Sequence, residues 1–160
     1  MALINLQNIR QSEGLLEDLQ EVRSLIEQRI NLDQYSTDQK TVALSNNKIM
    51  RICLLAGLSV TEQRNIVAIE DIQLSKTSNR IFETLFTLHN LGNIYSALLK
   101  LRYNGLNVDW DNAVLKSKII NAEIIRGSGL LLKEGILDDW LLNTTTQFST
   151  GRVGLIPLLN

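Results

Sequence analysis

Residues 78–103 read SNRIFETLFTLHNLGNIYSALLKLRY and form the most apolar of the helical patterns along the chain. Their large apolar side chains recur at steps of three and four and cover more than one face of a helix. A helix that is apolar on several sides is usually buried. The sequence therefore predicts a core helix over residues 78–103, in which Gly92 marks either close packing or a break into two pieces.

Similar apolar stripes on both sides of this segment predict an all-α fold. The only proline is Pro157, so long helices are permitted before it. We expect a single-domain bundle of five or six helices over residues 1–143, followed by an extended C-terminal tail over residues 144–160. Three further helices are expected before residue 78: residues 12–31, a helix from a cap at 36–38 to Ala56, and a helix from the 59–62 region to Leu74. Two more are expected after residue 103: a helix from a cap at Asn107 or Asp109 to Arg126, and a short helix over residues 130–143.

Glycines and capping residues set the expected boundaries. Gly57 stands where a glycine commonly follows the last turn of a helix. The residues from Ser59 to Glu62 fit a capping box that would start the next helix. Gly127 and Gly129 predict a break after Arg126. The stripe over residues 12–31 is narrow, and it fits either a short coiled-coil seam or an amphipathic helix on a core, with the core helix favoured.

Composition limits the function classes. The net charge is −1, with 44% hydrophobic and 21% charged residues, which is typical of a globular protein. Residues 41–103 carry seven basic and four acidic side chains, a mild positive bias. The start of the chain has no signal-peptide pattern, and no apolar run is long enough for a membrane span. We therefore expect a soluble cytoplasmic or virion protein that is not secreted.

The chain offers no recognisable catalytic, metal or cofactor site. His89 is the only histidine and Cys53 the only cysteine, and both lie in apolar helical patterns that favour a core position. The acidic pairs Asp109 and Asp111, and Asp138 and Asp139, have structural explanations as helix-start or surface residues. We expect no enzyme activity, no metal and no cofactor. An enzyme whose site cannot be recognised from the sequence is a third and less favoured interpretation.

A DNA-binding helix–turn–helix at residues 48–72 is the alternative interpretation. A recognition helix needs polar and basic side chains near its N-terminus to reach base edges. Thr61, Gln63, Arg64 and Asn65 would supply them. Glu62 and Glu70 weaken phosphate binding, and Gly-Leu-Ser is common in any tight helix joint, so nucleic-acid binding is not favoured.

The C-terminal tail favours a role in assembly. It holds six large apolar side chains, which an exposed terminus would leave in water: Phe148, Val153, Leu155, Ile156, Leu158 and Leu159. The tail either folds back onto its own bundle or docks on another chain. We expect a structural or adaptor subunit of a homo-oligomer or larger assembly, with a viral or phage connector or neck component as one form.

Overall fold

The computed structural model describes residues 3–32, 43–76, 80–81, 84–87 and 91–139. Within these ranges the chain forms seven helices and no strand beyond two isolated β-bridges. The helices are α1 (Leu15–Asp18), α2 (Gln20–Leu32), α3 (Asn46–Ser59), α4 (Ile66–Glu70), α5 (Thr84–Thr87), α6 (Leu91–Arg102) and α7 (Ala113–Leu131). The predicted all-α class is confirmed, whereas the predicted count of five or six helices is not.

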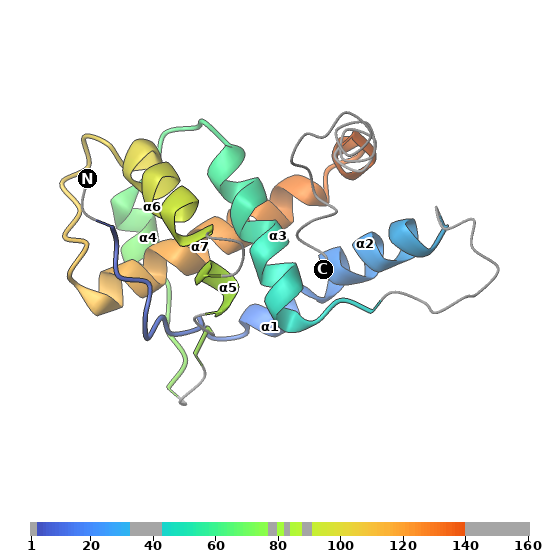
Figure 1. Cartoon of the computed structure of the whole chain (residues 1–160), viewed down its shortest axis with the longest axis horizontal. Coiled ribbons are helices and arrows are strands. Elements are labelled where there is room, and N and C mark those ends of the chain that lie inside the picture. The colour runs from blue at the N-terminus through green and yellow to red at the C-terminus, as the bar shows by residue number, and fades with distance from the viewer. Residues whose placement is uncertain (1–2, 33–42, 77–79, 82–83, 88–90, 140–160) are drawn as a thin grey trace.

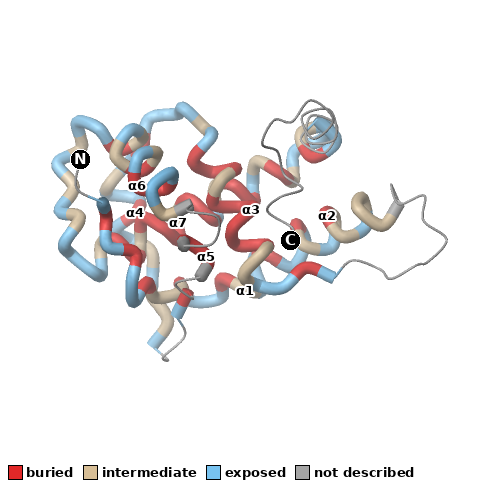
Figure 2. Tube along the Cα trace, in the orientation of Figure 1, coloured by how far each residue is buried: buried red, intermediate tan, exposed pale blue. Residues whose placement is uncertain are grey.

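Helices α3 and α7 cross at the centre of the molecule, and both are buried over much of their length (Figure 1, Figure 2). Their closest approach is at Gly57 and Gly127. A Cβ atom on Gly127 would lie 1.7 Å from the carbonyl oxygen of Cys53, and one on Gly57 would lie 2.0 Å from that of Glu123. Only glycine permits this separation, because any side chain would overlap the backbone of the other helix.

The two crossing glycines were expected to end helices, and that expectation is wrong. Gly57 lies inside α3, which continues to Ser59, and Gly127 lies inside α7, which continues to Leu131. The predicted capping box at Ser59 is also wrong, since the Ser59 hydroxyl donates to the carbonyl of Ala56 within α3. Asn65 caps α4 instead, and Asn112 caps α7.

Residues 3–13 cross α7, and they include a turn at Gln7 and Asn8. The Asn121 side chain fixes them, because its Oδ1 accepts from the Ser12 amide at 2.8 Å and its Nδ2 donates to the Arg10 carbonyl at 2.7 Å. The Ser117 hydroxyl accepts from the Arg10 amide at 3.1 Å. Two isolated β-bridges also pair Arg10 with Arg80 and Ser12 with Leu74. Asn121 therefore satisfies backbone groups of the segment that these bridges leave unpaired.

Within the predicted core helix over residues 78–103, the structure describes α5 and α6, and residues 78–79, 82–83 and 88–90 lie outside the described residues. Tyr95 of α6 packs edge-on against Phe86 of α5, with ring centroids 5.9 Å apart. Gly92 lies within α6. The central position belongs to α7, in which ten residues are buried.

Among the residues described, none forms a helix that is both long and apolar enough to cross a membrane.

Candidate functional site

The segment 60–65, between α3 and α4, holds all four residues that sequence analysis assigned to DNA contact. Thr61 and Gln63 are exposed. Asn65 is exposed too, but its Oδ1 accepts from the amides of Val67 and Ala68 and so caps α4. Arg64 differs from its neighbours, because its side chain is fully buried. The four residues therefore do not form one polar surface.

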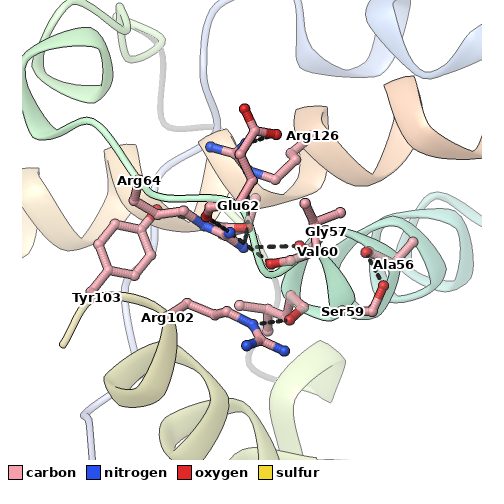
Figure 3. Close-up of polar contacts among 11 residues, drawn as sticks. Ala56, Gly57, Ser59, Val60, Glu62, Arg64, Arg102, Tyr103 and Arg126 are labelled. Atoms are coloured by element: carbon pink, nitrogen blue, oxygen red, sulfur yellow. Dashed lines mark hydrogen bonds and ion pairs between the residues drawn. The ribbon is translucent and has the colours of Figure 1, made fainter.

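Arg64 is the centre of a buried polar cluster (Figure 3). Its Nε and Nη2 donate to the two carboxylate oxygens of Glu123 at 2.8 and 3.1 Å. Its remaining donors bind the backbone carbonyls of Gly57, Val60 and Glu62. A guanidinium has five N–H groups, and these contacts engage all five. No donor of Arg64 is left to reach a base edge or a phosphate.

Glu123 receives further contacts from two side chains. The Tyr103 hydroxyl donates to its Oε1 at 2.7 Å, and Arg126 approaches its Oε2 at 3.5 Å. Arg126 also lies 3.9 Å from the carboxylate of Glu62, which is mostly exposed. Glu123 is itself fully buried, so its charge is stable in this position only because of these partners.

The buried environment also affects Tyr103. Burial raises the pKa of the Tyr103 hydroxyl, and the adjacent Glu123 carboxylate raises this pKa further by its charge and by the hydrogen bond. Arg64 and Arg126 oppose the shift. The hydroxyl therefore keeps its proton and acts as a fixed donor. Together, the cluster ties the 60–65 segment, α7 and Tyr103, which directly follows α6, to one point beside the glycine crossing.

The cluster has the features of a structural site. Its charges are matched, the donors of Arg64 are all engaged, and its two central side chains have no exposed surface. In the described ranges, no three His, Cys, Asp or Glu side chains are grouped closely enough to hold a metal ion. A cluster of this kind can fix the relative positions of three elements, and it offers no side chain to a substrate.

The other singled-out residues are dispersed. Cys53 is fully buried in α3, and burial raises the pKa of its thiol to about 12, so it stays protonated and unreactive at neutral pH. Asp109 accepts from the Asp111 amide at 3.0 Å in the turn before α7, and Asp138 pairs with Arg29 at 3.1 Å. His89 lies outside the described residues.

The predicted partner-binding residues of the tail also lie outside the described residues: Phe148, Val153, Leu155, Ile156, Leu158 and Leu159.

Asn121 and Glu123, the two polar residues that organise the interior, were not predicted from the sequence. Both are fully buried. The signal was present, because they interrupt an apolar run that contains Ile119, Ile120 and Ile124 on a helix otherwise facing the core. A polar residue in such a run requires a buried partner.

Comparison with protein-family models, with curated proteins and with solved structures finds no match for this chain.

Proposed function

We propose that the chain is a non-enzymatic structural or adaptor subunit of a multi-chain assembly, either a homo-oligomer or a larger complex. A connector or neck component of a virus or phage is one form of this function, and a cytoplasmic assembly is another. The observation that carries the proposal is the apolar tail. Residues 148–159 contain six large apolar side chains and a single charged residue, Arg152.

The balance of energies supports docking on a partner. Fully burying one large apolar side chain is worth about 1.5–3 kcal/mol. Ordering the backbone costs roughly 1–2 kcal/mol for each residue. The two totals are of similar size for a tail of about a dozen residues, so the tail needs a well-fitting surface to become ordered. A neighbouring subunit supplies such a surface in an assembly.

The body of the molecule suits a subunit with a rigid frame. The glycine crossing of α3 and α7 and the Arg64–Glu123 pair hold the central elements in one arrangement. DNA binding is not proposed as a second function, because the contacts of Arg64 leave its guanidinium buried and saturated. We expect no sequence-selective binding to duplex DNA.

Deletion of residues 145–160 tests the proposal. We expect the truncated chain to keep nearly all of its helical circular-dichroism signal and to associate more weakly than the full chain in light scattering. If the truncated chain unfolds, the tail is part of the core of the same chain. Unchanged folding and unchanged association would remove the main support for a structural subunit.

A further inference from the structure

Two of the six large apolar side chains that are exposed in the described part of the chain lie on α6. Ile94 and Leu101 are 48% and 61% exposed, and they lie seven residues apart, on the same side of the helix. Ala97 is exposed between them. We call Ile94, Ala97 and Leu101 the α6 face.

The α6 face carries few charges near it. Residues 84–99 contain no Asp, Glu, Lys or Arg, and the charged residues of α6 are Lys100 and Arg102, on either side of Leu101. The Nε of Arg102 donates to the Leu58 carbonyl at 2.6 Å. A surface of this kind matches an apolar partner with few charges better than a charged one.

The tail of the chain has that chemistry. Residues 140–160 carry one charge, Arg152, and the residues from 148 to 159 supply six large apolar side chains. Side chains on a helix surface form ridges with grooves between them, into which the apolar side chains of a partner can pack. Ala97 is a small residue between Ile94 and Leu101, so the surface is lower at this position.

The positions of the tail and the α6 face favour binding of a tail from a second copy over binding of the tail of the same chain. Residues 136–139 are tied to α2 by the Arg29–Asp138 pair, so the tail leaves the body beside α2. Helices α2 and α6 lie toward opposite ends of the longest axis (Figure 1). The nine steps from residue 139 to residue 148 span at most about 32 Å, which is little more than the length of α7, at 19 residues. A short link of this kind reaches a neighbouring copy beside α2 more readily than the far end of its own chain.

We propose that the α6 face of one copy receives residues 148–159 of a second copy. This inference rests on the proposed function and names the surface through which that function operates. Since the tail and its receiving face are different surfaces at different ends, the contact is head-to-tail. Such contacts continue from copy to copy and build either a closed ring or a filament.

Two double variants of the full chain test the face. Ile94→Ser with Leu101→Ser removes its large side chains from exposed positions, so the fold should remain intact by circular dichroism. Val67→Ser with Val114→Ser is the matched control, because these residues are 69% and 49% exposed on α4 and α7. By sedimentation over a concentration series, we expect the α6 variant to associate at least about tenfold more weakly and the control to behave as wild type.

A mixing experiment tests the second copy. The chain lacking residues 145–160 keeps the face without the tail, and the α6 variant keeps the tail without the face. We expect each alone to be monomeric and the mixture to form a 1:1 dimer that does not grow. If tail deletion abolishes association but the α6 variant still associates, the α6 face is not the receiving surface, and the proposed function is unaffected. If neither change weakens association, both the α6 face and the proposed function are contradicted. If the two proteins do not combine, the second copy is ruled out as the occupant.

Discussion

The guanidinium of Arg64 is held in a fully buried ion pair with Glu123 of α7. The position of Arg64 after a helix joint, among Thr61, Gln63 and Asn65, is typical of a recognition helix. Its partner, Glu123, is 59 residues further along the chain, and no local pattern connects the two. Whether a basic residue faces water or a distant carboxylate depends on the tertiary structure, so this part of the site could not be predicted from spacing alone.

The first prediction concerns this pair. Arg64→Ala leaves the Glu123 carboxylate buried with only Tyr103 and Arg126 nearby. Removing one partner of a buried ion pair typically costs about 3–5 kcal/mol. We expect a loss of that order in the free energy of unfolding, measured by urea denaturation.

Gln63→Ala is the control for Arg64→Ala, because it changes the adjacent, exposed residue of the same segment. A surface substitution of this kind should change the unfolding free energy by no more than about 0.5 kcal/mol. If both variants unfold at the same urea concentration, the ion pair contributes nothing to stability.

A second residue-scale prediction concerns Cys53. Burial raises the pKa of its thiol from 9.0 to about 12, so the folded protein holds this proton more tightly than the unfolded chain does. The associated stability is complete below pH 9 and is lost as the pH rises from about 9 to 12. The slope for one such group is at most about 1.4 kcal/mol per pH unit.

Urea denaturation between pH 8 and pH 11 measures this effect. Cys53→Ala should be less stable at pH 8, because it leaves a small cavity in the core. It should nevertheless lose stability less steeply than wild type above pH 9. Parallel curves would show that the thiol does not titrate on unfolding. The buried Tyr95 and Tyr103, whose pKa values are also raised by burial, are present in both proteins and affect both curves alike.

At the scale of elements, the third prediction concerns the crossing of α3 and α7. Gly127→Ala would place a Cβ 1.7 Å from the carbonyl oxygen of Cys53, so the two helices must move apart. Overpacking of this kind costs about 1–3 kcal/mol and sometimes more. We expect thermal unfolding at a clearly lower temperature.

Gly129→Ala provides an opposite control in the same helix, because a Cβ there would have no atom within 4 Å. Alanine is the better helix former by about 1 kcal/mol. This variant should therefore be more stable than wild type. Equal effects of the two substitutions would show that helix propensity, rather than the crossing, determines the role of Gly127.

Sequence patterns predicted the helical class but not where the helices end. The 12–31 pattern corresponds to α1 and α2, and the helix expected from Asn107 or Asp109 to Arg126 corresponds to most of α7. Glycine was the source of the largest errors, since Gly57 and Gly127 were interpreted as helix stops. A glycine that ends a helix cannot be distinguished, in a single sequence, from a glycine that allows a second helix to pack closely. Close packing at Gly57 depends on Gly127, which lies 70 residues away in the chain and is brought near only by the fold.

At the scale of the whole molecule, burial is concentrated in α3 and α7. Nine residues of α3 and ten of α7 are buried. In contrast, Val22 and Ile26 are the fully buried described side chains of α2, which lies toward one end of the molecule (Figure 2). Elements with few buried contacts open locally at a lower free energy than the core does.

Hydrogen exchange monitored by NMR should resolve this difference. We expect the amides of α3 and α7 to exchange only through global unfolding, and those of α2 to exchange at least about tenfold faster, through a local opening that costs less than global unfolding. Addition of urea separates the two routes, because global opening exposes more surface and responds more steeply. A common rate for α2, α3 and α7 would contradict this ordering.

The N-terminal segment has a consequence for synthesis of the chain. Ser12 binds Asn121, which follows it by 109 residues, and Arg10 binds Ser117, which follows it by 107. A ribosome adds about 5–20 residues per second, so the segment waits roughly 5–20 s for α7 to emerge. During that interval Ile4, Leu6 and Ile9, which are buried in the finished protein, remain uncovered on the nascent chain. The core therefore closes late in translation, and the N-terminal residues are the ones most in need of a chaperone until it does.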